Sequence, residues 1–199
     1  MNIAVLCSGS GSNLQAIIDK AGSGYINADI AVVVSDNKDA FALKRAKKAG
    51  IETLILDPKD FASREAFDGE VIKNLRRKKI GLVVLAGYMR LLSDRFIKEY
   101  KNRVMNIHPA LLPSFKGTHG VRDALEYGAK VTGPTVHFVD EKLDHGPIIM
   151  QKAIAVKGSD TEESLLKRMR KEEHKIFPEA IKLFVEGRLK INGRRLAVK

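Results

Sequence analysis

Cysteine is nearly absent from this 199-residue sequence, which contains only Cys7 and no tryptophan. A single cysteine excludes an internal disulfide framework and a cysteine-rich zinc site. No apolar run is long enough to cross a membrane. The first residues, MNIAVLCSGSGSN, have no basic segment ahead of the apolar one, as a secretory signal would have. We therefore expect a cytoplasmic protein that has no membrane partner.

Acidic residues are few relative to basic ones: 24 Asp and Glu stand against 35 Lys and Arg, which gives a formal charge of +11. The basic residues are dispersed, as in KRAKKAG and RRKK, without interleaved aromatic residues and without a known nucleic-acid module. This pattern argues against RNA or DNA as a partner. It favours a solvated basic surface that attracts small anionic molecules.

The length allows one good hydrophobic core, and 44% of the residues are hydrophobic. We find no internal repeat, no linker and no low-complexity tract. The sequence thus predicts a single domain over residues 1–199, although two small lobes remain an alternative.

Strands and helices alternate through the first hundred residues. Apolar runs such as IAVVV and LVVLA have the length and composition of buried parallel strands. Such alternation is typical of right-handed βαβ crossovers, so we predict an α/β fold with a Rossmann-like, mostly parallel sheet and helices on both faces. The predicted strands span residues 2–7, 30–34, 53–56 and 82–86, and the predicted helices span residues 13–20, 40–49, 63–78 and 93–100, with Ser63 as an N-cap.

The pattern changes in the C-terminal part. A short helix at 119–127 is followed by the alternating run TVHFV and by a strand within 147–156, which together predict antiparallel strands. A long helix at 161–186 should begin with a capping box, formed by Ser159 or Thr161 with the acidic residues that follow, and should be bent or interrupted near Pro178. A hairpin about Asn192-Gly193 should end the chain.

A glycine loop, SGSGS at residues 8–12, separates the first strand from the first helix. Backbone amides at a helix N-terminus bind phosphate, Gly9 and Gly11 allow the tight turn, and Ser12 or Asn13 can cap the helix or bond a ligand oxygen. A dinucleotide fingerprint does not fit, because its third glycine falls on Leu14, and a Walker loop would need a Lys-Ser/Thr pair. An ordinary turn with a helix cap remains the alternative.

The stretch VMNIHPALLPSFKG at residues 104–117 is the strongest candidate for chemistry. Asn106 and His108 occupy the end of a predicted strand that Pro109 cannot continue, and residues i and i+2 of a strand point the same way. Ligands bind at this edge of open α/β sheets. An amide can donate to a developing oxyanion and an imidazole can move protons, which suits acyl-type transfer. The alternative is that both residues only terminate a strand.

A turn-rich loop, DEKLDHG at residues 140–146, supplies three carboxylates. We connect Asp144 with His108, because a carboxylate beside an imidazole fixes its tautomer and favours the proton-bearing form. A calcium loop would need EF-hand spacing and further ligands, which do not follow. We interpret His137 as a strand residue rather than a metal ligand, and we predict no metal site.

Two further stretches can hold a ligand. Arg64 lies in the first turn of its helix, where the dipole disfavours a cation, so an anionic ligand is conceivable beside an ordinary solvated arginine. The loop GYMRLL at residues 87–92 offers apolar side chains for a flat ring system, or for packing of the next helix.

Three segments, SGSGSN, NIHPALLPSFKG and LDHGPII, occur in one chain in this order. Together they resemble the folate-dependent formyltransferases over nearly the full length. The Asn, His and Asp set is specific to that family, and the serine-glycine loop points to its glycinamide ribonucleotide branch in the short single-function form. The sequence departs from the family at Ser10, where Asn is as readily accepted, and at His145, where glycine is common. Neither change removes a group that the chemistry needs.

The resemblance implies roles for individual residues and assigns phosphate binding to the N-terminal half, and folate binding and catalysis to the C-terminal half. The implied catalytic residues are Asn106, His108 and Asp144; substrate phosphate and amine would be bound by Gly11, Ser12, Asn13 and Glu173; and the folate would be bound by Arg64, Met89, Arg90, Leu91, Leu92, Asn106 and Asp140.

The implied reaction transfers the formyl group of 10-formyltetrahydrofolate to the amine of glycinamide ribonucleotide, without a metal. A formyltetrahydrofolate hydrolase and an initiator tRNA formyltransferase are rivals, but both usually carry an extra domain that 199 residues do not accommodate. A nucleotide-binding module without catalysis would leave Asn106, His108 and Asp144 unexplained. The sequence leaves open whether the protein is a monomer or a homodimer, and whether residues 111–130 form a mobile lid.

Overall fold

The computed structural model describes all 199 residues, which form two compact units, Met1–Met105 and Asn106–Lys199. The division falls inside one strand, β5 (Val104–His108). We describe each unit in turn.

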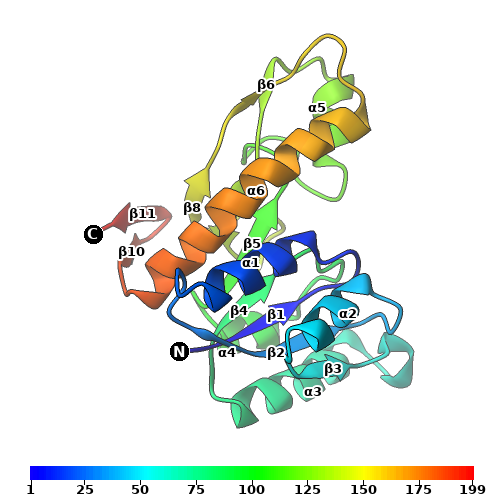
Figure 1. The fold of residues 1–199 in the computed structure, drawn as a ribbon, viewed down its shortest axis with the longest axis vertical. Coiled ribbons are helices and arrows are strands. Elements are labelled where there is room, and N and C mark those ends of the chain that lie inside the picture. Colours follow the sequence, from blue (N-terminus) through cyan, green and yellow to red (C-terminus); the bar gives the residue numbers. More distant parts are fainter. The chain divides into compact units, whose positions relative to one another are not determined.

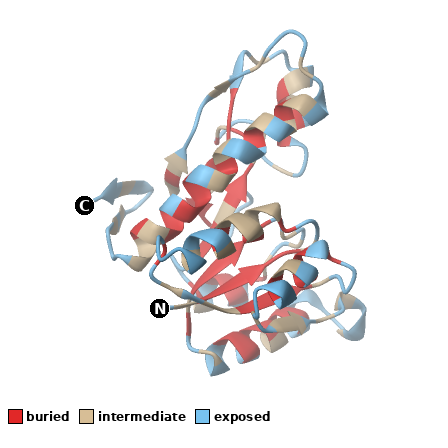
Figure 2. Cartoon of the chain, in the orientation of Figure 1, coloured by how far each residue is buried: buried red, intermediate tan, exposed pale blue.

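The strands of the first unit form a parallel arrangement in the order β3-β2-β1-β4 (Figure 1). This confirms the parallel α/β pattern that the sequence predicts. The centre of this arrangement is fully buried, since residues 3–7 expose no surface and are apolar on both faces of the sheet (Figure 2). The four strands are β1 (Asn2–Leu6), β2 (Asp29–Ser35), β3 (Thr53–Ile55) and β4 (Ile80–Leu85).

The helices of the first unit form two pairs, in which α1 contacts α2 and α3 contacts α4. The chain moves from β1 outward to β3 and then crosses back to β4, so right-handed crossovers place the later helices on the opposite face. Ser63 caps α3 as predicted, accepting a hydrogen bond from the Ala66 N–H. The elements are α1 (Ser12–Gly22), α2 (Phe41–Lys48), a 3₁₀ turn (Pro58–Asp60), α3 (Arg64–Arg77) and α4 (Asp94–Glu99).

The second unit contains the antiparallel strands that the sequence predicts. The strand order is β5-β7-β8, in which β7 (Thr135–Phe138) pairs antiparallel with β8 (Ile148–Gln151). A separate antiparallel pair joins β6 (Val131–Thr132) to β9 (Ile154–Ala155).

The strand predicted within residues 147–156 is present as β8, and the chain forms a second short strand, β9, after a break at Lys152. Gly133 causes this break. Its backbone passes so close to Lys152 that a Cβ on Gly133 would lie 1.8 Å from the Lys152 carbonyl oxygen. The chain therefore changes its pairing partner there, from β7 to β6.

Two helices cover the second unit, α5 (Gly120–Glu126) and the 24-residue α6 (Glu162–Val185). The predicted interruption at Pro178 is wrong, because α6 continues through it. Phe177 and Ile181 beside the proline are fully buried, and this packing outweighs the one backbone hydrogen bond that proline removes. The capping box is present, but the residue that completes it with Thr161 is Ser164 rather than an acidic residue.

A hairpin of β10 (Leu189–Asn192) and β11 (Arg195–Val198) follows α6, as predicted. Its two turn residues are Gly193 and Arg194, one position later than expected, because Asn192 still pairs with Arg195. Gly193 has φ +60, which glycine adopts without a steric cost. No helix of the structure combines the length and the apolar character that crossing a membrane requires.

Candidate active site

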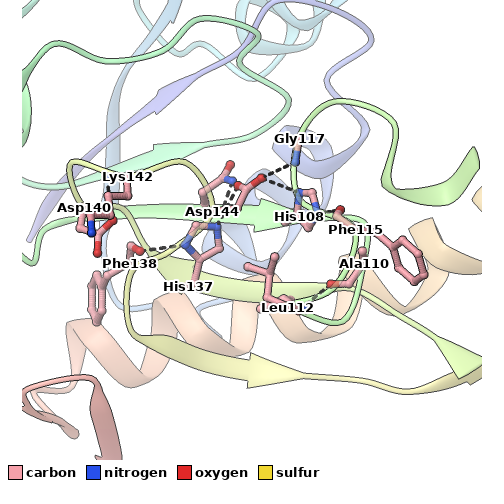
Figure 3. A network of polar contacts seen from close by, with 12 residues as sticks. His108, Ala110, Leu112, Phe115, Gly117, His137, Phe138, Asp140, Lys142 and Asp144 are labelled. Atoms are coloured by element: carbon pink, nitrogen blue, oxygen red, sulfur yellow. Dashed lines mark hydrogen bonds and ion pairs between the residues drawn. The ribbon is translucent and has the colours of Figure 1, made fainter. Parts of the chain in front are cut away.

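The C-terminal end of β5 carries Asn106 and His108 on one face of the strand, and Pro109 follows directly. Close by lie Asp144, from the loop between β7 and β8, and His137, from β7 (Figure 3). The side chains of His108, His137 and Asp144 are each less than a tenth exposed. His108 and Asp144, which the sequence analysis connects, therefore lie close together. Asn106 joins them through its contact with His137.

Both ring nitrogens of His108 face acceptors. Nε2 lies 2.8 Å from the carbonyl oxygen of Phe115, and Nδ1 lies 3.4 Å from Asp144 Oδ2. A carbonyl oxygen only accepts, so Nε2 carries a proton in this arrangement. When Nδ1 is also protonated, the ring and Asp144 form an ion pair.

Asp144 is fixed by the backbone as well as by His108. Its Oδ2 accepts a hydrogen bond of 2.8 Å from the Gly117 N–H, so the carboxylate also holds the segment that follows β5. Asp144 itself has φ +45, a conformation that aspartate adopts more readily than most residues other than glycine.

His137 has a defined tautomer. Its Nδ1 lies 2.8 Å from the carbonyl oxygen of Phe138 and must donate to it, so the neutral ring offers Nε2 as an acceptor. Burial lowers the pKa of His137, and the nearby Asp144 opposes this shift only in part. The ring is therefore neutral at pH 7, and Nε2 accepts a hydrogen bond of 3.2 Å from the Asn106 amide.

That tautomer sets the orientation of Asn106. Because Nε2 of His137 is an acceptor, Asn106 must present its NH₂ group to it. The amide nitrogen has two protons and this contact uses one. The second proton is available to an oxygen that becomes negatively charged, which is the role of an oxyanion donor.

The segment that follows β5 is tied to the neighbouring strands. The Thr135 hydroxyl donates to the carbonyl oxygen of Ala110 at 2.6 Å and accepts from the N–H of Leu112 at 3.1 Å. Gln151 donates to the carbonyl oxygen of Leu112 at 2.9 Å. These contacts fix the first residues after His108, and whether residues 111–130 move as a lid stays a prediction.

Asp140 and Glu173 complete the candidate residues of the second unit. Asp140 begins the loop that carries Asp144, and its Oδ1 accepts a hydrogen bond from the Lys142 N–H. Glu173 lies on α6 and is only 6% exposed. Nowhere do three or more His, Cys, Asp or Glu side chains gather in a way that could hold a metal ion.

The glycine loop of the first unit is built from backbone contacts. Gly11 is the N-cap of α1 with φ +68, and Ser12 and Asn13 are its first helical residues, so the predicted capping by one of them is wrong. The reason is close packing, since a Cβ on Gly11 would lie 2.7 Å from two carbon atoms of Ala42. The N–H groups of the first helical turn remain suited to an anion.

The glycine loop and the loop that follows β4 lie together. The N–H of Ser8 donates to the carbonyl oxygen of Gly87, and the Ser8 hydroxyl accepts from the N–H of Met89, both at 3.0 Å. Met89 is 71% exposed and Leu91 is 60% exposed, which leaves apolar surface beside the loop. Leu92 is half-buried.

The two candidate arginines of the first unit are held near Asp68. Burial raises the pKa of Asp68, while Arg64 and Arg90 both oppose that shift through their charges. Arg90 also stacks on Phe67, with 4.8 Å between its guanidinium carbon and the ring centroid. Arg64 is about half exposed and pairs only with its neighbour Glu65, which leaves it accessible to an anion.

Sequence reasoning missed the contribution of His137 and Thr135. The available signal was the alternation in TVHFV, which places both residues on the same face of β7. Both residues reach partners far away in the sequence, since Asn106 is 31 residues from His137 and Ala110 is 25 residues from Thr135.

The family description of formyl transferases matches residues 1–181. Over 96% of this chain and 91% of the relative, the sequence is 46% identical to phosphoribosylglycinamide formyltransferase of Escherichia coli. It is 47% identical to a trifunctional purine biosynthetic protein of Drosophila melanogaster, of which it spans only 14%. The crystal structure of glycinamide ribonucleotide transformylase 1 from Symbiobacterium toebii has a TM-score of 0.98 and 50% identity, covering 100% of this chain and 93% of the other.

Proposed function

Since this chain belongs to the formyl transferase family, we propose that it transfers the formyl group of 10-formyltetrahydrofolate to the amine of glycinamide ribonucleotide. The products are formylglycinamide ribonucleotide and tetrahydrofolate, and the reaction is a step of purine biosynthesis. The observation that carries the proposal is the set of contacts that brings Asn106, His108 and Asp144 together, in a chain that resembles enzymes named for this reaction.

The reaction needs a stabilised oxyanion and one proton transfer. The amine nitrogen attacks the formyl carbon and forms the new C–N bond, which turns the carbonyl into a tetrahedral oxyanion. Collapse of this intermediate breaks the bond to the folate nitrogen, which takes up the proton that the amine releases. No covalent adduct with the enzyme is required.

Asn106 is the oxyanion donor in this proposal. Its amide is oriented by His137, and the second amide proton donates to the developing charge. A preorganised donor of this kind typically lowers a barrier by about 2.7 to 4 kcal/mol.

His108 is the proton carrier and Asp144 orients it. The Nδ1 atom faces the carboxylate, so Nε2 is the atom that serves the substrate, and it must exchange the Phe115 carbonyl oxygen for the reacting groups. A protonated ring at this position stabilises the oxyanion and supplies the proton for the leaving nitrogen.

Binding of each of the two substrates uses residues from both halves of the chain, which we propose to act as one domain over residues 1–199. Phosphate is bound at the N-terminus of α1 by Gly11, Ser12 and Asn13, where the N–H groups of the first helical turn and the helix dipole favour an anion. The buried carboxylate of Glu173 suits the substrate amine. The folate is held by Arg64, Met89, Arg90, Leu91, Leu92, Asn106 and Asp140.

We propose the remaining properties from the sequence rather than from the site. The protein uses no metal, acts on small molecules rather than nucleic acid or membranes, and works in the cytoplasm as a monomer or a homodimer. Its charge of +11 attracts the two anionic substrates.

The ultraviolet change that accompanies loss of the formyl group from formylfolate tests the proposal. We expect turnover only when glycinamide ribonucleotide is present. Turnover without the amine would indicate a hydrolase, and no turnover with both substrates would indicate a binding protein; either result would overturn the proposal.

A further inference from the structure

Three side chains form a line outside the residues assigned so far to catalysis. His145 Nδ1 lies 2.7 Å from Asp140 Oδ2, and Arg194 Nη1 lies 2.8 Å from Nε2 and 3.1 Å from Nδ1 of the His145 ring. Asp140 and His145 belong to the loop between β7 and β8, whereas Arg194 belongs to the turn of the C-terminal hairpin. The line therefore connects two segments 49 residues apart.

The Asp140 carboxylate fixes the direction of its hydrogen bond with His145. An ionised carboxylate only accepts, so Nδ1 of His145 carries a proton and donates to Asp140. Arg194 Nη1 lies within 3.1 Å of both ring nitrogens, so the guanidinium lies against the ring and does not select a tautomer. The histidine ring thus lies between a cation and an anion.

Asp140 closes the loop at two points. Its Oδ1 accepts from the Lys142 N–H at 3.1 Å, and its Oδ2 accepts from His145, so one carboxylate holds both ends of the loop (Figure 3 labels Asp140 and Lys142). Asp144, between these ends, has separate anchors in His108 and the Gly117 N–H. Loosening the carboxylate of Asp140 should therefore disturb the loop more than it disturbs Asp144.

The hairpin is a suitable support for the arginine. Its base is closed by one backbone hydrogen bond and one side-chain hydrogen bond. The N–H of Lys199 donates to the carbonyl oxygen of Arg188, and the Arg188 side chain donates to the carbonyl oxygen of Lys199. The strand β11 also contacts β8, which follows the loop. The turn residue Arg194 is thereby held over the loop.

We propose that Arg194 is a positioning residue for the folate site: through His145 it holds the Asp140 carboxylate, and with it the loop at residues 140–146, in the conformation that binds the folate. This inference rests on the proposed function, in which Asp140 contacts the folate. The catalytic Asp144 is held independently. The contribution of Arg194 therefore lies in folate binding and not in the chemical step.

The test compares Arg194→Ala with Arg195→Ala. Arg195 is the next residue of the same hairpin and is exposed, so both variants lose one positive charge from the same place. We expect Arg194→Ala to raise the KM for 10-formyltetrahydrofolate about three- to tenfold, as loss of a charge-assisted hydrogen bond would. We expect kcat and the KM for glycinamide ribonucleotide to change less than about twofold, because Asp144 keeps its anchors. Arg194→Lys, which keeps a donor, should restore the folate KM to within about twofold of the wild type.

Two outcomes would overturn the proposal. Equal folate KM values for Arg194→Ala and Arg195→Ala would show that only the charge matters. A fall in kcat as large as the rise in KM would show general damage. In a His145→Gly background, Arg194→Ala should have no further effect, since the histidine that links the two residues is gone.

Two readouts separate this inference from the proposed function, because neither requires turnover. Calorimetric binding of tetrahydrofolate should weaken in Arg194→Ala by the same factor as the KM rises. The ¹⁵N resonances of the His145 ring should shift in Arg194→Ala and stay in place in Arg195→Ala, because Arg194 lies against the ring. Unshifted ring resonances in Arg194→Ala contradict the line of contacts even in an active enzyme, whereas the expected shift in a protein that transfers no formyl group would contradict only the proposed function.

Discussion

The candidate sites of the two units are held together by different kinds of contact, backbone contacts in the first unit and side-chain contacts in the second. In the first unit, backbone groups shape the glycine loop: Gly9 accepts from the Ala42 N–H, Ser8 donates to Gly87, and Gly11 lies against Ala42. In the second unit, side chains from distant segments bind one another, as Asn106 and His137 do. The first kind of site is sensitive to added atoms and the second to removed functional groups. Substitutions should therefore affect stability in the first unit and turnover in the second.

The largest effect is expected in the second unit. His108→Ala and Asp144→Asn should each lower kcat by about 10²-fold or more, since they remove the proton carrier or the carboxylate that orients it. Steady-state kinetics should show both KM values within a few fold of the wild type. His119→Ala is a suitable control, because His119 is an exposed histidine that caps nothing through its side chain. Turnover of either site variant within a few fold of wild type would mean that the assigned roles are wrong.

In the first unit the corresponding change is Gly11→Ala. Its Cβ would lie 2.7 Å from Ala42 at a φ of +68, so strain and overpacking together should lower the free energy of unfolding by about 2 to 4 kcal/mol. Urea denaturation measures this loss. Gly9→Ala is the matched control, because nothing lies within 4 Å of its added Cβ and a change below about 1 kcal/mol is expected. Equal effects of the two variants would show that the close contact with Ala42 does not matter.

A smaller effect on stability is expected at the start of α6. Ser164→Ala removes the side chain that accepts from the Thr161 N–H, which should cost about 1 kcal/mol in urea denaturation. Ser159, the alternative cap in the sequence, is exposed and lies outside the capping box, so Ser159→Ala should leave the stability unchanged. A greater loss in Ser159→Ala than in Ser164→Ala would contradict the observed cap.

The smallest effect is a pH dependence from His137. Burial lowers the pKa of His137 in the folded protein below the ordinary value of 6.5. In mildly acidic solution the His137 ring is therefore protonated in the unfolded chain but neutral in the folded chain. Stability is therefore unaffected above about pH 6.5 and decreases as the pH falls below the unfolded pKa, until the folded pKa is reached. His137→Gln, whose amide oxygen can still accept from Asn106, should reduce this acid sensitivity in urea titrations at pH 7 and pH 5. An identical pH profile would show that His137 titrates normally.

Much of the fold could be predicted because its signals are local. The apolar strands and the Ser63 cap each depend on a few neighbouring residues. The differences from prediction occur where distant residues decide the outcome. Lys152 breaks a strand because Gly133 lies against it, and α1 has no side-chain cap because Ala42 packs on Gly11.

The candidate site follows the same division. Asn106 and His108 could be found together because they are two residues apart on one strand. Asp144 could be connected with His108 from the chemistry that an imidazole needs, and the structure places the two 3.4 Å apart. His137 could not be found in this way, since its role depends on a tautomer that the Phe138 carbonyl oxygen imposes and that no pattern of residues encodes.

The left-handed backbone of Asp144 has a consequence for engineering this protein. Glycine would occupy that conformation with less strain than an aspartate does, so the residue proposed to orient His108 is also one where a simple replacement relaxes the chain. A screen for heat resistance alone weighs that relief only against the contacts of the carboxylate with His108 and the Gly117 N–H, and not against its proposed role in turnover. Thermostable variants of this protein should therefore be screened for turnover in every round.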